Sequence, residues 1–198
     1  STTVFFENQH WLGQRWVAVV GAQALSSKRR FEDLLPVPFN ASFDRRYDAF
    51  SPKLGLRFEA AEGVQWFANL SRSAEPPSFG ELAGGPNVTL VDLQRANSGE
   101  VGLRYSRDGL DLDAVVYRAN VENELLALTD GNGNPLGTRN ADRTIHQGLE
   151  LSTRWAFARQ WQVALNALVN DFRFDGDAAF GDDELAGLPR EWLRAELA

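Results

Sequence analysis

The sequence predicts an all-β fold, an antiparallel up-and-down meander of about nine strands that forms part of a transmembrane β-barrel. Three observations support this prediction. Apolar and polar residues alternate with a period of two along most of the 198 residues, which is the pattern of strands with two different faces. Most of the expected strands have about ten residues or more, the length that membrane strands need, whereas soluble strands have about 5–6. Tight turns also alternate with long polar segments, as they do in outer-membrane barrels.

The expected strands follow one another along the chain as hairpins. In the second hairpin, Leu54 and Leu56 alternate with polar residues before the turn, and Trp66 and Leu70 continue the alternation after it. The later hairpins repeat this pattern, with Val101 and Leu103, and then Leu149 and Leu151, on the apolar side. We place the nine strands at residues 2–11, 15–25, 49–60, 64–73, 97–106, 110–120, 144–157, 161–173 and 190–198.

The tight turns and the long segments lie at opposite ends of these strands. The turns are Gly13-Gln14, Ala61–Gly63, Arg107–Gly109 and Ala158–Gln160, and the long segments are 26–48, 74–96, 121–143 and 174–189. Each tight turn can join only adjacent antiparallel strands, so every strand should pair with the next one in sequence. No amphipathic helix is expected. Nine strands leave two open edges, which we expect to pair with another copy or to close on each other.

Aromatic residues recur beside the tight turns. They are Trp11 and Trp16 at the first turn, Phe58 and Trp66 at the second, Tyr105 at the third, and Trp155 and Trp161 at the last. In a membrane barrel such rings form a girdle at the interface. The alternative is a soluble β-sandwich or β-barrel that binds carbohydrate or protein. The direction of the apolar side chains separates the two, because in a soluble sheet they point into a core.

The composition excludes several classes of function. The net charge is −7 and no basic patch occurs, so nucleic acid is not expected as a partner. The chain has no cysteine, which excludes disulfides, thiolate metal sites and a cysteine nucleophile. No nucleophile motif appears, and "DGNGNP" at 130–135 has proline where a calcium loop needs glycine. We therefore expect no enzyme activity, no metal site and no cofactor.

Four segments resemble the barrel of TonB-dependent outer-membrane receptors. They are "SPKLGLRFEAAEGVQWFANLSRSAEPPSFGEL" (51–82), "NSGEVGLRYSRDGLDLDAVVYRANVENEL" (97–125), "NADRTIHQGLELSTRWAF" (140–157) and "AGLPREWLRAEL" (186–197). Their order and spacing are similar to the family over essentially the whole chain. One departure is Arg190, which stands where the family usually has His or Lys after the proline.

The resemblance implies a protein of the bacterial outer membrane that takes part in TonB-dependent import of a scarce, bulky ligand such as a ferric siderophore. The implied partners are outer-membrane lipid and lipopolysaccharide, a small-molecule ligand such as a metal chelate, the receptor's own plug domain and the TonB complex. The family barrel has about 22 strands, and neither a plug nor a TonB box is recognised in the sequence. We therefore expect residues 1–198 to be a partial β-barrel domain of such a receptor.

Two glutamates are expected to face the barrel lumen. Glu100 and Glu150 lie on the polar faces of their strands, and a carboxylate in a membrane strand avoids lipid. The resemblance implies that both face the plug and pair with its arginines. The alternative is local pairing with wall arginines such as Arg57, Arg104 or Arg154. Arg57 and Arg104 are expected on the same plug-facing surface.

The long segments carry the expected contacts for a ligand. Guanidinium groups suit carboxylate and catecholate oxygens, so arginines near aromatic residues are candidates to hold an anionic, partly aromatic chelate. The candidates are Arg45, Arg46, Tyr47, Arg72, Phe79, Arg139 and Asn140. For each of them the alternative is a solvated loop residue or a contact with lipopolysaccharide.

Overall fold

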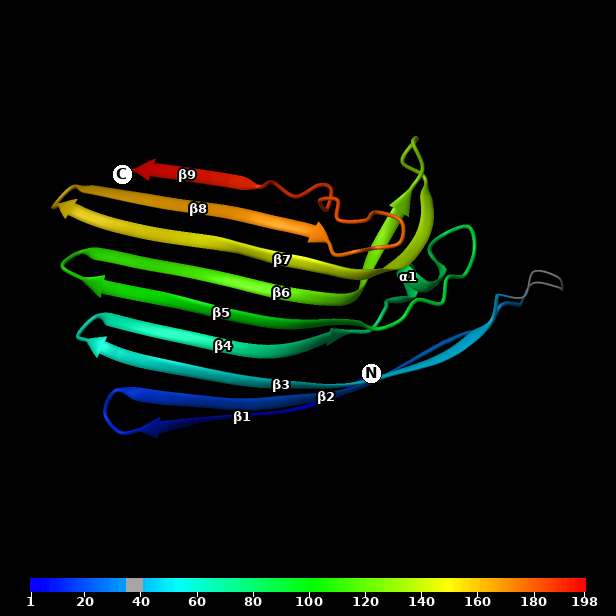
Figure 1. Cartoon of the computed structure of the whole chain (residues 1–198), viewed down its shortest axis with the longest axis horizontal. Helices are drawn as coiled ribbons and strands as arrows, with labels where there is room; N and C mark the ends of the chain where they lie inside the picture. Colours follow the sequence, from blue (N-terminus) through cyan, green and yellow to red (C-terminus); the bar gives the residue numbers. More distant parts are fainter. Residues whose placement is uncertain (35–40) are drawn as a thin grey trace.

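The structure, a computed structural model, describes residues 1–34 and 41–198. Within these residues, nine strands form one antiparallel sheet in which each strand pairs with the next (Figure 1). The predicted meander is confirmed. The elements are β1 (Thr2–Leu12), β2 (Trp16–Phe31), β3 (Phe43–Ala61), β4 (Val64–Glu75), α1 (Phe79–Ala83), β5 (Gln94–Arg107), β6 (Leu110–Thr129), β7 (Pro135–Ala158), β8 (Trp161–Phe174) and β9 (Glu191–Leu197).

Four strands are longer than predicted by about five residues or more. β2 and β3 reach into 26–48, and β6 and β7 take up most of 121–143, so these segments are largely the ends of long hairpins and not loops. Strands that pass beyond the lipid have no lipid-facing apolar band, so their alternation is weak and the prediction missed them. The prediction of no helix was also wrong. The short helix α1 begins after Ser78, which forms a capping box with Glu81.

The tight turns gather at one end of the sheet (Figure 1). The predicted aromatic residues lie next to these turns in the sequence and therefore at the same end. Gly63 and Gly109 occupy these turns with φ angles of +73° and +78°, a conformation that favours glycine. Trp16 stacks on Phe58, with the ring centroids 4.3 Å apart. Trp155 is half exposed. The register places Trp16, Phe58 and Trp155 on the convex face, where an interface girdle requires them. Trp11 does not fit this girdle, because it lies on the concave face against Arg57.

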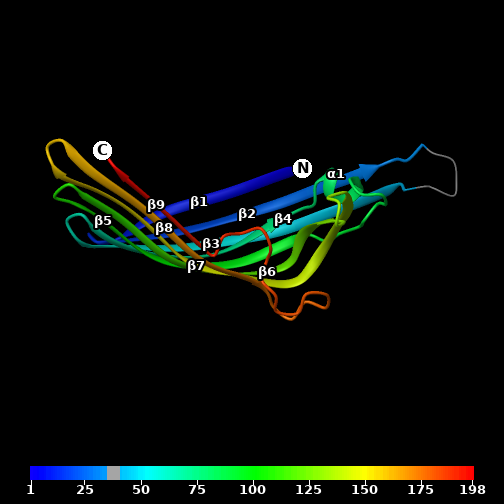
Figure 2. The same ribbon diagram turned by 90° about the horizontal axis from the view of Figure 1, so that it is seen from above.

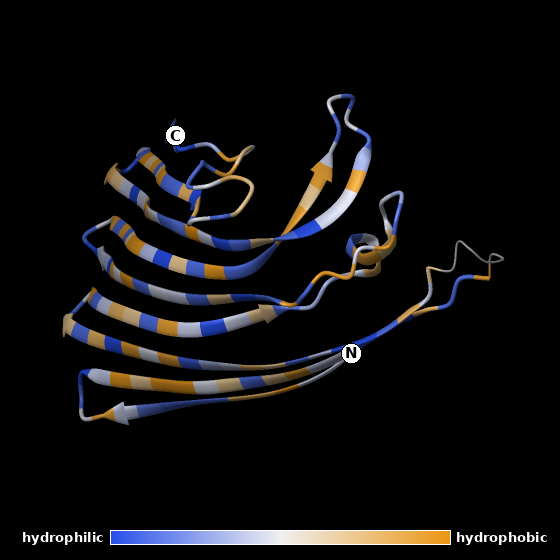
Figure 3. Cartoon of the chain, turned by 45° about the vertical axis from the view of Figure 1, so that its right-hand side comes forward, coloured by the Kyte–Doolittle hydropathy of each residue, from blue (hydrophilic) through white to orange (hydrophobic). Residues whose placement is uncertain are grey.

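The sheet is a single curved layer (Figure 2), and hydrophobic and hydrophilic residues alternate along its strands (Figure 3). Cross-strand pairing places Leu56, Val101 and Leu149 in one row on the convex face. Their exposed fractions are 40%, 54% and 45%, and no second sheet covers them among the described residues. The apolar side chains thus face outward, as in a membrane barrel, and the soluble sandwich alternative is wrong.

Most of the buried apolar residues lie at the end with the long connections, although Val17 is buried beside the first tight turn. At the end with the long connections, α1 and residues 84–93 fold over the concave side of the sheet (Figure 2). Phe43, Leu82 and Val91 form a buried cluster, in which the Leu82 side chain is fully buried. No helix in the described ranges is long and apolar enough to cross a membrane.

The sheet has two edges, β1 and β9, and each pairs with only one neighbouring strand. The expectation that the two edges close on each other is therefore wrong. The nine strands form an open arc whose concave face is polar and whose convex face is apolar, which is the arrangement of a barrel wall.

Candidate functional site

The two predicted lumenal glutamates lie on the concave face, on β5 and β7, which are separated by β6. Glu100 of β5 sits between Asn69 and Tyr117 of the adjoining strands. Glu150 of β7 sits between Val115 and Leu168. Both glutamates line one groove of about 650 Å³. The structure therefore brings the two carboxylates together on one wall.

Neither glutamate has a cationic partner among the described residues. The Asn69 Nδ2 group donates a hydrogen bond to Glu100 Oε1 at 2.6 Å. Glu150 makes neither a hydrogen bond nor an ion pair within residues 1–34 and 41–198. A carboxylate on the wall of a barrel then depends on water or on a cation from outside this sheet.

The two wall arginines are held by other acids. Arg104 Nε lies 2.9 Å from Asp113 Oδ2, and the Arg104 guanidinium sits 4.7 Å from the centroid of the Phe67 ring. Arg57 Nε lies 3.6 Å from Glu59 Oε1. Local pairing of these arginines with Glu100 or Glu150 is therefore not what the structure shows.

Glycines on the concave face make room for larger side chains, a feature that was not predicted from the sequence. A Cβ atom at Gly102 would lie 2.2 Å from the Phe67 ring, and one at Gly148 would lie 2.8 Å from the Tyr117 hydroxyl oxygen. The Tyr117 hydroxyl donates to Asn170 Oδ1 at 2.7 Å. Glycine beside glutamate in "EVG" and "GLE" is the signal that could have indicated these close contacts.

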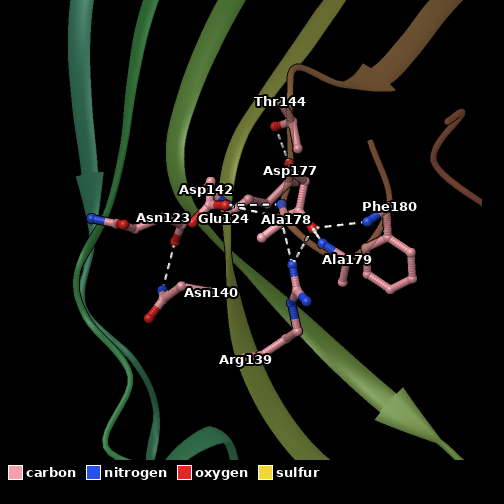
Figure 4. Close-up of polar contacts among 10 residues, drawn as sticks. All are labelled: Asn123, Glu124, Arg139, Asn140, Asp142, Thr144, Asp177, Ala178, Ala179 and Phe180. Atoms are coloured by element: carbon pink, nitrogen blue, oxygen red, sulfur yellow. Dashed lines mark hydrogen bonds and ion pairs between the residues drawn. The ribbon is translucent and has the colours of Figure 1, made fainter. Parts of the chain in front are cut away.

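At the end with the long connections, a buried carboxylate ties the β8–β9 connection to β7 (Figure 4). Arg139 Nη2 donates to Asp177 Oδ1 at 2.6 Å, and the backbone N–H groups of Asp142, Ala179 and Phe180 donate to the same carboxylate. Burial raises the pKa of Asp177, but these hydrogen bonds outweigh it and hold the pKa well below its ordinary value.

Two other predicted ligand residues also hold connections in place. Asn140 accepts a hydrogen bond from the Asp92 N–H at 2.7 Å and donates to the Asn123 carbonyl oxygen at 2.8 Å. The buried Tyr47 donates its hydroxyl to the Val91 carbonyl oxygen at 3.0 Å. Both residues lie at the end with the long connections, and their structural partners were not predicted from the sequence.

The remaining four predicted ligand residues lie on different faces. Gly55 and Asn69 lie on the concave face, and side chains alternate between the two faces along each strand. Arg45 therefore lies on the concave face, and Arg46 and Arg72 lie on the convex face. Phe79 belongs to α1 and is half exposed. The seven predicted residues therefore do not converge on one pocket.

A small polar cluster on β6 and β7 was also not predicted, because His146 and Glu124 lie 22 residues apart in the sequence. His146 Nε2 lies 3.1 Å from Glu124 Oε2 and 3.3 Å from Thr144 Oγ1. The imidazole ring stacks on Phe172 with the centroids 4.6 Å apart. Across the described ranges, no group of three or more His, Cys, Asp or Glu residues could hold a metal ion.

The chain is similar to known outer-membrane receptors in sequence profile and in structure. The family profile described as TonB dependent receptor-like, beta-barrel matches residues 1–191. The copper transporter OprC matches with a TM-score of 0.82 and 18% identity, over 98% of this chain and 31% of that one. The ferric yersiniabactin uptake receptor FyuA from Yersinia pestis matches with a TM-score of 0.74 and 16% identity, over 98% and 30%. The siderophore receptor PiuA from Acinetobacter baumannii gives 0.72 and 14%, over 98% and 30%.

No curated protein matches the sequence. At these sequence identities, the solved structures show the fold alone. This chain spans roughly 30% of their length. The family profile covers nearly the whole chain, and it agrees with the meander, the tight turns at one end and the outward apolar face. Receptors of this family are transporters of the bacterial outer membrane and not enzymes. The chain therefore belongs to the β-barrel family of TonB-dependent outer-membrane receptors.

Proposed function

We propose that this chain forms part of the wall of a receptor that imports a scarce, bulky metal chelate such as a ferric siderophore, with energy from the TonB complex. The observation that carries the proposal is the pair of concave carboxylates, Glu100 and Glu150, which share a groove and have no cationic partner in the described sheet. In the whole receptor, the concave face encloses a plug domain that opens to let the ligand pass.

The role of the two glutamates follows from their charge. A carboxylate inside a barrel is stabilised by a nearby cation, and the wall arginines Arg57 and Arg104 are already paired. We propose that arginines of the plug supply the missing charge to Glu100 and Glu150. Arg57 and Arg104 would face the plug beside these two glutamates. Their ion pairs with Glu59 and Asp113 would stabilise the wall.

The ligand would first meet the end with the long connections. Of the seven predicted contacts, we propose that Arg45 and Phe79 bind it, although the Phe79 ring also contacts Arg29 and Phe43. Arg45 is exposed on the concave face, with no hydrogen bond or ion pair to a described residue. Phe79 adds a half-exposed ring. A guanidinium and an aromatic ring together suit an anionic chelate.

The test uses charge reversal in the full-length receptor. Glu100→Lys and Glu150→Lys should raise sensitivity to vancomycin and lower uptake of a ⁵⁵Fe-labelled siderophore on which the wild-type strain grows. Each loss of a plug contact is worth about 1–3 kcal/mol, which is enough to loosen the plug while the barrel still assembles. Glu62→Lys, at an exposed turn, is the matched control. Unchanged leakage and uptake with both glutamates reversed would contradict the proposal.

A further inference from the structure

The convex face of β1 carries polar side chains at positions where the neighbouring strands carry apolar ones. On β3, the residues that face outward within the apolar band are Phe50, Pro52, Leu54, Leu56 and Phe58. The register places opposite them, across β2, the β1 residues Val4, Phe6, Asn8, His10 and Leu12. Asn8 is therefore the middle one of these β1 residues, and His10 follows it toward the first tight turn.

The contacts of the residues beside Asn8 and His10 show that both side chains point outward. Lys53 Nζ donates a hydrogen bond to Glu7 Oε2 at 2.9 Å on the concave face. The Arg57 guanidinium lies 5.7 Å from the centroid of the Trp11 ring on the same face. Successive side chains of a strand point to opposite faces. Asn8 and His10 therefore face the lipid side of the wall.

Neither polar side chain has a partner in this sheet. Within residues 1–34 and 41–198, Asn8 and His10 form no side-chain hydrogen bond and no ion pair, and both are exposed. Thr153 on the convex face of β7 differs, because its hydroxyl donates to the Asp111 carbonyl oxygen at 3.0 Å. A polar group in hydrocarbon without a hydrogen-bond partner is costly. Asn8 and His10 therefore require donors and acceptors from outside this sheet.

The convex face of β2, directly beside these residues, is unusually flat. Opposite the β1 residues, the register places Trp16, Ala18, Val20, Ala22 and Ala24. The convex face of β8 instead carries larger side chains, which are Trp161, Val163, Leu165 and Val169 beside one alanine, Ala167. Small residues allow two membrane-spanning elements to approach closely. We call Asn8, His10, Ala18, Ala22 and Ala24 together the β1–β2 patch.

We propose that the β1–β2 patch is a contact between two copies of the receptor within the membrane. The Asn8 amide carries donors and an acceptor, and the neutral His10 imidazole carries one of each. The same two residues of a second copy can therefore satisfy both side chains. Copies that enter the membrane in one orientation can be related by a twofold axis along the membrane normal, which brings a patch against itself. The inference depends on the membrane-spanning wall and not on the import function.

The test cross-links copies of the full-length receptor in outer membranes, with one introduced cysteine as the only cysteine. Ala18→Cys leaves Asn8 and His10 intact, and a short bis-methanethiosulfonate cross-linker should then give covalent dimers on denaturing gels. The matched control is Ala68→Cys, which lies in the same cross-strand row on the convex face. Because Ala68 is two strands away from Ala18, it lies roughly 10 Å farther from the contact in each copy and should give no dimer.

Further variants in the Ala18→Cys receptor test the polar residues themselves. N8L/H10L should lower the yield of covalent dimer at least about tenfold, because the hydrogen bonds between the copies are lost. Gln9→Leu changes the residue between them, which faces the lumen, and should leave the yield unchanged. Heat-dependent migration on gels shows that each variant is folded.

Four outcomes would overturn the proposal. They are no dimer from Ala18→Cys, an equal yield from Ala68→Cys, an unchanged yield in N8L/H10L, and a cross-link from Ala18→Cys to a different protein in place of a second copy. Uptake of a chelate can fail or succeed independently of these results, since the cross-link is measured without ligand.

Discussion

The environment of Asp177 sets how the β8–β9 connection responds to pH. This carboxylate is buried against β7 and accepts hydrogen bonds from Arg139 and from three backbone N–H groups. Its pKa is lower in the folded chain than in the unfolded one. The stabilisation is therefore fully present above the unfolded value of about 3.9 and is lost only as pH falls through the folded value. The connection should remain anchored at pH 5 as it is at pH 7.

Removing the charge of Asp177 should release this connection. In Asp177→Asn, the Arg139 guanidinium loses its anionic partner, and opening of residues 174–189 should become easier by about 3 kcal/mol. Amide exchange there should then accelerate on the order of 100-fold, as measured by hydrogen exchange on the full receptor. Asp183→Asn is the control, since that side chain is exposed and has no partner among the described residues. Equal protection in both variants would show that Asp177 does not anchor the connection.

On the concave face, the sequence predicted which side of the sheet a residue occupies but not which residues it contacts. Period-two alternation was sufficient to place Glu100 and Glu150 on the polar face, because one side of a membrane strand must be apolar. Their local partners were not predicted, since partners depend on register. Counting outward from the turn at 107–109 would have paired Arg104 with Asp113. The contacts of Arg139 and Tyr47 join segments more than 35 residues apart, and no local pattern contains that information.

At the scale of elements, the sequence predicted strands in the membrane better than strands beyond it. Contact with lipid requires apolar residues on one face of each strand. This pattern allowed the membrane-spanning parts of β3 to β8 to be predicted. Apolar and polar residues do not alternate at the outer end of β6, where Leu125, Leu126, Ala127 and Leu128 follow one another, so the strand ends on either side of 130–134 were not predicted. Helix α1 has five residues, which is too short for a detectable helical period.

The buried cluster around α1 should be separable from the barrel wall. Leu82 is fully buried against Phe43 and Val91, and Leu82→Ala should weaken this packing by about 2–3 kcal/mol. Hydrogen exchange should then show lost protection in residues 79–93, with β4 and β5 unchanged below them. Leu90→Ala is the matched control, because Leu90 lies in the same connection and is 47% exposed. Loss of protection throughout β4 and β5 would mean that α1 supports the wall itself.

At the scale of the whole molecule, the nine strands cannot complete a barrel. The edges β1 and β9 leave one side of each strand unpaired, and backbone groups without partners are costly in lipid, about 1–3 kcal/mol each. The convex face adds exposed apolar residues such as Val116, at 60%, and Leu193, at 70%. We therefore expect the 198-residue chain, refolded by itself in detergent, to associate through its edges into dimers or larger species. Analytical ultracentrifugation with density-matched detergent measures this, with the full-length receptor in the same detergent as the control. A stable monomer with the circular dichroism of nine intact strands would contradict the expectation, since it would show that open edges of this length survive without a partner.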